Sequence, residues 1–408
     1  MYFLPPFHQS SLLRTALLAV ALLPLTGRSE AMTREPPPVS SDPAGLIWHS
    51  RPGPWGELEI RSLYLEAPDA RVDGLKHPST TTGWNFPGGS EAMLLALWER
   101  AGLSKETQAR LMDPNRILLH EHVWTLFPDA AVVAGMTLEQ RSVIYAELAK
   151  STLNPMHESP AYVTGNRVED WLRQAQLADV QKDIVRQLLW KDGDLLAFSD
   201  VSLLLGQATS DAEILHIFKF MTRVRALVVQ LKLSASSDLR NLASYWTGAG
   251  LNTDGLPLLT SEVEGGRQSA IDITHLLPPL PRKLLYTYPT LASAASGRLP
   301  DCQWTAFNFF NTEPNEYYLD TRLTVTHLRE AYQDVSPPYQ YGDILELVNA
   351  AGDAIHGCVY IADDIVYTKN GDGIIRPWVL MWLSDVENLY MRETGMKIVG
   401  HRLKPVAP

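Results

Sequence analysis

The chain of 408 residues is longer than one typical domain, and its 45% content of hydrophobic residues excludes a wholly disordered protein. Its formal net charge of −11 and the lack of a basic patch argue against partners such as nucleic acid or an anionic membrane surface. It has only two cysteines, Cys302 and Cys358, so neither a disulfide-rich scaffold nor a cysteine-rich zinc site is expected.

Residues 1–31 have the pattern of a secretory signal peptide. Arg14 precedes an apolar run from Ala16 to Leu25, and small residues at Ser29 and Ala31 provide a cleavage site. The run is shorter than the roughly 20 residues that a membrane-spanning helix needs. An uncleaved anchor is the alternative. We therefore expect export to the periplasm or the exterior, and a mature chain with no integral membrane span.

The next part of the chain is predicted to be a flexible leader and then a helical domain. Residues 32–45 are rich in proline. Residues 46–285 are predicted to form a mainly α-helical domain of unknown role, because apolar side chains recur at helical spacing. Thr137 and Gln140 have the spacing of a capping box. The helical stretches expected are Ser90–Ala101, Trp171–Trp190 and Ala212–Leu233, and residues 247–267 are expected to be a loop.

Residues 286–408 change character and predict a separate α+β domain. A short helical stretch, Asp301 to Phe310, comes first. Runs rich in β-branched and aromatic residues follow, separated by Gly, Asp and Asn, which is typical of an antiparallel sheet built from hairpins. These runs are Ile344–Val348, Ile355–Ile361, Ile365–Thr368 and Trp378–Leu383.

Cys302 and His356 are the strongest candidates for catalysis. Asp301 is a favourable N-cap residue, so Cys302 would be the first residue of the helix. The partial positive charge there favours a thiolate and thus a nucleophile. His356 lies in a predicted strand, and contact with the helix start would make it the general base. The alternatives are a cysteine that is merely buried and a disulfide with Cys358, which shares a strand face with His356.

Three short motifs together resemble the NlpC/P60 group of papain-like cysteine hydrolases. They are Asp301-Cys302 opening a helix, Gly342-Asp343-Ile344 before a strand, and His356-Gly-Cys-Val-Tyr-Ile in the next strand. The resemblance covers about residues 285–400. It implies a papain-like antiparallel sheet with an N-terminal catalytic helix, Cys302 as nucleophile and His356 as base.

The resemblance also implies substrate-binding residues at the helix start. The Ser and Gly that follow the cysteine in the family are replaced here by Gln303 and Trp304. In the family this serine helps to recognise the amine end of a peptidoglycan stem peptide. Asp301, Gln303 and Trp304 are therefore the candidate substrate-binding residues, and their departure from the family pattern leaves the identity of the substrate open.

A third catalytic residue is expected to orient the imidazole. If the strands that flank Ala362-Asp363-Asp364 pair regularly, Asn370 lies opposite His356, and Thr368 lies opposite Cys358. We expect Asn370 to be the orienting residue, because its amide oxygen accepts an imidazole N–H better than a hydroxyl does. Thr368 is the second choice.

The resulting prediction is an exported cysteine peptidase or amidase that acts on cell-wall peptides through an acyl-enzyme. No metal or organic cofactor is expected, and the sequence gives no oligomeric state. One alternative is a non-catalytic binding or structural protein on the same fold. Another is a transglutaminase-like acyltransferase, in which Asp363 or Asp364 would complete the Cys–His pair.

Two weaker motifs receive structural interpretations. His120-Glu121-His122 lacks the helical i, i+4 spacing of zinc proteases and has no identifiable third ligand. Gly371-Asp372-Gly373 is most simply a turn, since a calcium loop needs acidic residues at alternating positions and a distal Glu.

Overall fold

The computed structural model describes residues 47–73, 80–266 and 268–405. The signal peptide and the leader predicted for residues 1–45 lie outside these ranges. Within them, no helix combines the length and the apolar character needed to cross a membrane.

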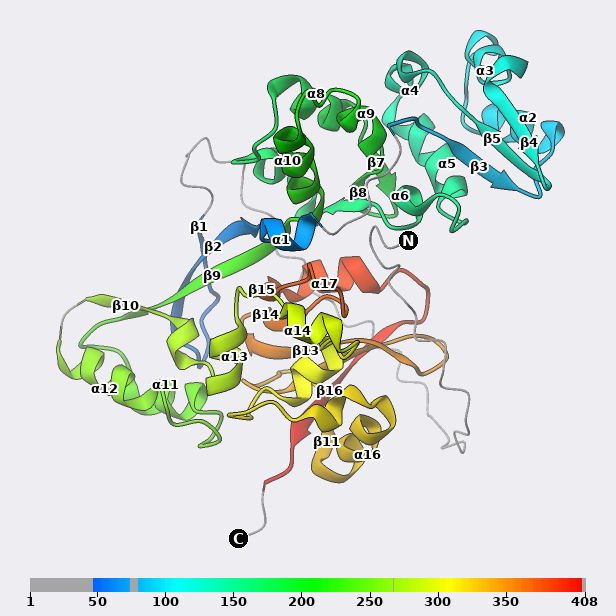
Figure 1. The fold of residues 1–408 in the computed structure, drawn as a ribbon. Helices are drawn as coiled ribbons and strands as arrows, with labels where there is room; N and C mark the ends of the chain where they lie inside the picture. The colour runs from blue at the N-terminus through cyan, green and yellow to red at the C-terminus, as the bar shows by residue number, and fades with distance from the viewer. Residues whose placement is uncertain (1–46, 74–79, 267, 406–408) are drawn as a thin grey trace. The chain divides into compact units, whose positions relative to one another are not determined.

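The contacts within the chain divide it into two compact units (Figure 1). The middle unit contains Tyr64–Arg225 and the short segment Gly373–Ile375. The C-terminal unit contains residues 47–63, Ala226–Asp372 and residues 376–405. The second unit therefore begins about sixty residues before the boundary predicted at residue 285, and it also includes the first described strand.

The middle unit combines short helices with two small antiparallel sheets, of strand order β3-β5-β4 and β6-β8-β7. Its strands are β3 (Trp84–Pro87), β4 (Ile117–His120), β5 (Val123–Leu126), β6 (Ala161–Val163), β7 (Trp190–Asp192) and β8 (Leu195–Phe198). Its helices are α1 (Asp69–Val72), α2 (Glu91–Arg100), α3 (Lys105–Leu111), α4 (Ala130–Gly135), α5 (Leu138–Leu148), α6 (Pro155–Glu158), α7 (Val168–Leu172), α8 (Asp179–Gln187), α9 (Val201–Leu205) and α10 (Asp211–Thr222).

The capping box predicted before α5 is confirmed. The Gln140 amide donates to the Thr137 hydroxyl at 3.2 Å, and the Thr137 amide donates to Gln140 Oε1 at 2.9 Å. Three other expectations from the sequence are wrong. The stretch Trp171–Trp190 is not one helix, because α7 ends at Leu172, α8 spans Asp179–Gln187 and Trp190 begins β7. The stretch Ala212–Leu233 is a helix only as far as Thr222, after which the β-branched run becomes a strand. Residues 247–267, expected to be a loop, contain a helix over Leu256–Glu264.

The C-terminal unit contains two sheets. The first has the order β1-β2-β9-β10 and consists of β1 (Ile47–His49), β2 (Glu57–Leu65), β9 (Val224–Leu233) and β10 (Ser269–Asp272). The helices that follow β9 and β10 are α11 (Leu239–Trp246), α12 (Leu256–Glu264), α13 (Pro279–Leu284) and α14 (Leu291–Ala295). The region predicted as mainly helical therefore also contains strands, including one that is almost wholly buried, β9.

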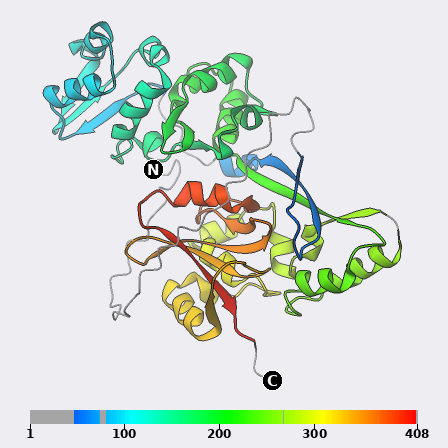
Figure 2. The ribbon, with the colours of Figure 1, turned by 180° about the vertical axis from the view of Figure 1, so that it is seen from behind.

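The second sheet is antiparallel throughout, with the order β11-β16-β12-β13-β14-β15. Figure 2 shows its strands from behind in orange and red. They are β11 (Tyr332–Val335), β12 (Ile344–Val348), β13 (Ala354–Ala362), β14 (Ile365–Lys369), β15 (Trp378–Trp382) and β16 (Lys397–Leu403). The strands predicted between residues 344 and 383 are thus confirmed to within one residue at each end. The α+β class is confirmed as well.

Helices cover both faces of this sheet. The first is α15 (Cys302–Phe307). It lies on the face to which Tyr367 of β14 points, because the ring centre of Phe309, just after the helix, is 5.8 Å from that of Tyr367. The next residue, Thr368, points to the opposite face because side chains alternate along a strand. On that face lies α17 (Leu383–Tyr390). A further helix, α16 (Thr321–Ala331), precedes β11.

Candidate active site

Cys302 is the first residue of α15, as the sequence predicts. Asp301 has extended backbone angles and caps the helix, because its carboxylate accepts the Trp304 amide at 2.7 Å. The Thr305 hydroxyl donates to the Asp301 carbonyl oxygen at 2.6 Å. These two bonds fix the backbone on either side of Cys302, whose side chain is half-buried.

The body of α15 is anchored by buried aromatic side chains. The Trp378 indole donates to the Thr305 hydroxyl at 3.0 Å, which ties the helix to β15. Trp304 is only 4% exposed, and its ring centre lies 6.2 Å from that of Trp378. Trp304 is therefore a core residue, and the structure gives its predicted role in binding substrate no support.

Gln303 lies against β13. A Cβ atom placed on Gly357 would be 3.2 Å from Gln303 Oε1, which is tighter than most real contacts. The same oxygen is buried and has no hydrogen-bond partner among the described residues. Glycine at position 357 thus allows the start of α15 to approach the strand that carries His356.

One ring nitrogen of His356 has a hydrogen-bond partner, and the other has none within the described residues. The ring is 1% exposed, and its Nε2 lies 2.9 Å from the Thr368 hydroxyl. That hydroxyl also donates to the Gly357 carbonyl oxygen at 3.2 Å. A hydroxyl has one proton to donate. Because Thr368 donates it to the Gly357 carbonyl oxygen, the hydroxyl oxygen must accept the hydrogen bond from the Nε2–H of the imidazole. Nδ1 is then the unprotonated nitrogen, and it has no partner in the described part of the chain.

The His356 imidazole therefore bonds to Thr368 and not to Asn370. The strand register is close to the predicted one, with Val359 opposite Tyr367 and Tyr360 opposite Val366, although a bulge near Ala362 alters it at the turn. In this register Asn370 is the residue opposite His356. The hydrogen bond from His356 runs diagonally across the strand pair to Thr368, two positions earlier. Diagonal neighbours on a twisted sheet are within reach of long side chains.

Asn370 is near the imidazole but does not bond to it. Its amide nitrogen donates to the Met381 sulfur at 3.1 Å, and its oxygen accepts from the Tyr390 hydroxyl at 3.5 Å. The Tyr390 ring, in turn, stacks on His356 with the ring centres 3.9 Å apart. Asn370 thus touches the residue that covers His356.

Cys302 and His356 are both uncharged in this structure. No hydrogen bond joins the sulfur to the imidazole within the described residues. Burial lowers the pKa of His356 to about 3. Burial and the neighbouring Asp301 carboxylate raise the pKa of Cys302 to about 12. The ion pair expected from the sequence is therefore not formed.

Three nearby groups act in the opposite direction and favour the Cys302 thiolate. The backbone amides of Gly357 and Gln303 and the ammonium of Lys369 all lower the pKa of the thiol. The Gly357 amide belongs to the residue next to His356. The start of α15 therefore reaches β13 at the residue next to His356.

The remaining cysteine is a separate, buried thiol. Both cysteines are free, so the alternative of a Cys302–Cys358 disulfide does not apply. Cys358 is fully buried, and its thiol donates to the Leu345 carbonyl oxygen at 3.7 Å.

The transglutaminase-like alternative needs Asp363 or Asp364 beside His356. Both residues lie beyond the far end of β13, whereas His356 lies near its start. Asp363 and Asp364 form the turn between β13 and β14, with φ angles of 42° and 64°. The backbone amide and the guanidinium of Arg51 both donate to the Asp363 carboxylate, at 2.9 and 2.6 Å. Arg51 also pairs with Asp364.

The His120-Glu121-His122 motif forms an exposed hairpin turn between β4 and β5. Glu121 and His122 have φ angles of 46° and 64°, the left-handed conformation of a tight turn. Across the described ranges, no group of three His, Cys, Asp or Glu side chains is placed to hold a metal ion.

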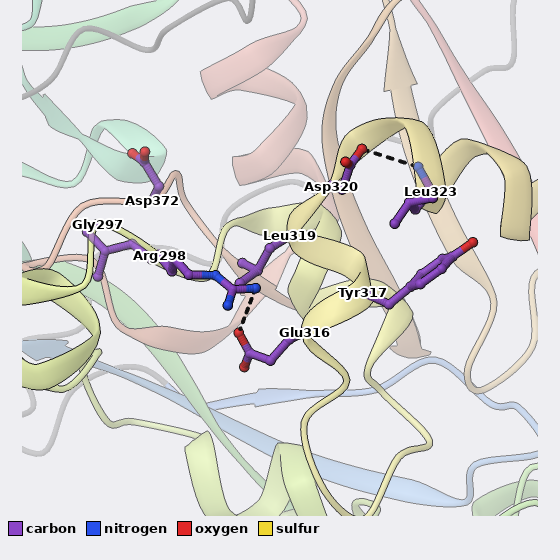
Figure 3. A pocket seen from close by; sticks show the side chains of 9 residues that line it. Gly297, Arg298, Glu316, Tyr317, Leu319, Asp320, Leu323 and Asp372 are labelled. Carbon is purple, nitrogen blue, oxygen red and sulfur yellow. Dashed lines mark hydrogen bonds and ion pairs between the residues drawn. The ribbon is translucent and has the colours of Figure 1, made fainter.

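A groove of about 530 Å³ lies beside the segment that leads into α15 (Figure 3). Arg298 and Glu316 form an ion pair across it at 3.6 Å, and Tyr317 is 40% exposed in its wall. The residues that line it are Gly297, Arg298, Leu299, Glu316, Tyr317, Leu319, Asp320, Leu323 and Asp372. No expectation from the sequence included this groove.

Comparisons with known proteins do not assign the chain to a family. No protein-family model, no curated protein and no solved structure matches it.

Proposed function

We propose that this protein is a cysteine hydrolase that cleaves amide bonds through an acyl-enzyme, with Cys302 as nucleophile, His356 as base and Thr368 as orienting residue. One observation carries the proposal: the His356 imidazole is held at Nε2 by Thr368 while its buried Nδ1 stays unoccupied. Buried polar atoms are usually hydrogen-bonded, so a buried ring nitrogen without a partner is a candidate for a functional role. A general base needs it free.

The proposed reaction begins with an uncharged pair. As the sulfur attacks the amide carbon, the thiol proton moves to His356 Nδ1, the S–C bond forms and the carbonyl electrons move to oxygen. The C–N bond then breaks, and the amine leaves with the proton from the imidazolium. Water next attacks the acyl-enzyme, again giving its proton to Nδ1. The C–S bond breaks, and the thiol recovers the proton as the acid is released.

The uncharged resting pair has a kinetic consequence. Because burial disfavours both the thiolate and the imidazolium, proton transfer accompanies the attack and does not precede it. The free thiol should therefore react more slowly with alkylating agents than the thiolate of a preformed ion pair would.

Peptides are the proposed substrates, and peptidoglycan stem peptides are the specific candidates. The latter follow from the likeness of the Asp301-Cys302, Gly342-Asp343-Ile344 and His356 motifs to NlpC/P60 hydrolases. The groove beside α15 offers a place for the chain of such a substrate, since its wall segment continues into Asp301 and Cys302. An exported protein would meet this substrate in the cell wall.

The proposal is tested with purified, reduced protein and two substrates, defined stem peptides and whole peptidoglycan. Mass spectrometry would follow new amine ends and trap the acyl group on a tryptic peptide containing Cys302. The matched controls are Cys302→Ala and Cys358→Ala. Cleavage by the parent and by Cys358→Ala alone is the expected result. Cleavage that survives in Cys302→Ala, or no acyl-enzyme with any peptide, would refute it, and transfer of a labelled amine in place of hydrolysis would indicate an acyltransferase.

A further inference from the structure

One wall of the groove in Figure 3 is the segment that leads into α15. Arg298 and Leu299 line this wall, and Leu299 lies three residues before Cys302. Because consecutive Cα atoms are about 3.8 Å apart, the Cα atoms of Leu299 and Cys302 are separated by at most about 11 Å. An extended peptide advances about 3.3 Å per residue. A side chain held in the groove therefore belongs to a residue about three positions from a bond at the Cys302 sulfur.

The opposite wall is fixed to the other end of the same helix. It contains the short 3-10 helix Glu316–Leu319. Asn315, just before it, donates its backbone amide to Asn308 Oδ1 at 2.7 Å, and Asn308 Nδ2 donates to the Asn315 carbonyl oxygen at 3.2 Å. The ring centre of Tyr318 lies 5.5 Å from that of Phe307 in α15. Both walls are thus attached to the helix of the nucleophile, and a groove formed in advance lowers the entropic cost of binding.

An exposed ion pair crosses the groove. Arg298 Nη2 lies 3.6 Å from Glu316 Oε2, and the two side chains are 59% and 55% exposed. A pair in such contact with water contributes little to stability, so the two side chains can separate at small cost. A guanidinium binds a carboxylate through two parallel hydrogen bonds, and a carboxylate accepts hydrogen bonds from an ammonium. Once separated, the pair offers one site for each charge.

The other side chains of the groove restrict what can bind between these two. The Asp320 carboxylate is occupied, since it accepts the backbone amides of Arg322 and Leu323 at 2.9 and 3.4 Å. Tyr317 and Leu323 are 40% and 39% exposed and offer contact area to an aliphatic chain. Asp372, on the Arg298 side in Figure 3, adds a negative charge. The groove therefore disfavours a group that is only anionic.

We propose that this groove is a subsite for a substrate residue whose aliphatic side chain ends in an amino-acid group, with an ammonium and a carboxylate on one carbon. The carboxylate pairs with Arg298 and the ammonium with Glu316, so a single group replaces the partners that the two side chains give each other. A substituent with one charge leaves either Arg298 or Glu316 without a partner. This inference rests on the proposed function, because it requires that the peptide extend from Cys302 into the groove.

The test measures the binding of four synthetic peptides to Cys302→Ala, which cannot form the acyl-enzyme. The peptides differ at one residue, whose side chain ends in an amino-acid group, an ammonium, a carboxylate or a methyl group. Isothermal titration calorimetry should show that the first binds about tenfold more tightly than the others. In the same background, Arg298→Gln should weaken it to the affinity of the ammonium peptide. Glu316→Gln should weaken it to the affinity of the carboxylate peptide.

Two matched controls remove the same charges outside the groove. Arg329→Gln and Glu330→Gln change exposed residues of α16 that do not line it, and both should keep the preference. Equal affinities for the four peptides, or the same loss in the controls, would overturn the subsite, even if the parent cleaves peptides. The expected preference without any acyl-enzyme in the parent would instead overturn the proposed function and leave the groove as a binding site alone.

Discussion

The imidazole ring of His356 lies flat against the phenol ring of Tyr390, with the ring centres 3.9 Å apart and the planes 12° apart. Tyr390 is the last residue of α17, so this helix covers one face of the His356 ring. The negative face of an aromatic ring attracts a cation. Tyr390 therefore favours the imidazolium form of His356 that the proposed reaction requires, although burial favours the neutral ring.

Removal of this ring should slow the chemical step. We expect Tyr390→Leu to lower kcat on the order of tenfold with little change in KM, since the imidazolium loses its aromatic partner. Steady-state kinetics with a stem peptide would check this. Tyr390→Phe is the matched control and should keep most of the activity, because it keeps the ring and removes the hydroxyl that bonds to Asn370 at 3.5 Å. Equal losses in the two variants would assign the role to the hydroxyl instead.

The choice between Thr368 and Asn370 is open to direct test. Thr368→Val removes the hydroxyl that bonds to Nε2 of His356 at 2.9 Å and keeps the shape of the side chain. We expect it to reduce the single-turnover acylation rate by about tenfold to a hundredfold, the usual cost of losing such an orienting bond. Asn370→Ala should have a smaller effect, and Thr368→Ser should restore activity. A large loss only in Asn370→Ala would return the orienting role to that residue.

The local features of the site were predictable from the sequence. The Asp301 cap, the start of α15 at Cys302 and the strand that holds His356 all depend on residues within a few positions of one another. The pairing of Val359 with Tyr367 also follows from the short turn between the strands. The diagonal bond from His356 to Thr368 does not, because it depends on sheet twist and on the bulge at Ala362.

The features that escaped prediction depend on contacts between distant segments. Tyr390 reaches His356 only because α17 folds back over the sheet. Lys369 looks like an ordinary exposed residue at a strand end until the loop after it and α15 enclose it. Trp304 belongs to the core for the same reason, since the Trp378 that it packs against is far away in sequence. The strands of the middle unit are three or four residues long, too short for periodicity to distinguish them.

The two cysteines should respond differently to substitution. Cys302→Ala should abolish hydrolysis and leave the fold intact, because its side chain is half-buried and forms no disulfide. Cys358→Ala should retain activity. It should lower the free energy of unfolding by about 1 kcal/mol, because it leaves a small cavity in a fully buried place. Peptide cleavage and urea unfolding would check both. An inactive but stable Cys358→Ala would show that this thiol takes part in the chemistry.

The middle unit contains two buried groups whose titration affects stability in opposite directions. His157 is 6% exposed, its ring centre lies 4.5 Å from that of Tyr145, and burial lowers its pKa to about 3. Asp200 is 2% exposed and accepts the Tyr145 hydroxyl at 3.0 and 2.9 Å. Burial raises the pKa of Asp200 to about 7.

The last prediction follows from the signs of these two shifts. Between the folded pKa of His157, about 3, and its ordinary value of 6.5, the unfolded chain binds the extra proton, so this histidine makes stability increase with pH. Between 3.8 and about 7 the folded chain binds the extra proton at Asp200, so this carboxyl makes stability decrease with pH. Each contributes a slope of about 1.4 kcal/mol per pH unit, and over the shared range they cancel.

Relative to the parent, His157→Phe should therefore lose stability as pH rises from 4 to 6.5, whereas Asp200→Asn should gain it. Thermal unfolding of the full chain across this range would show the two opposite trends, and parallel curves for both variants and the parent would mean that neither group titrates as described.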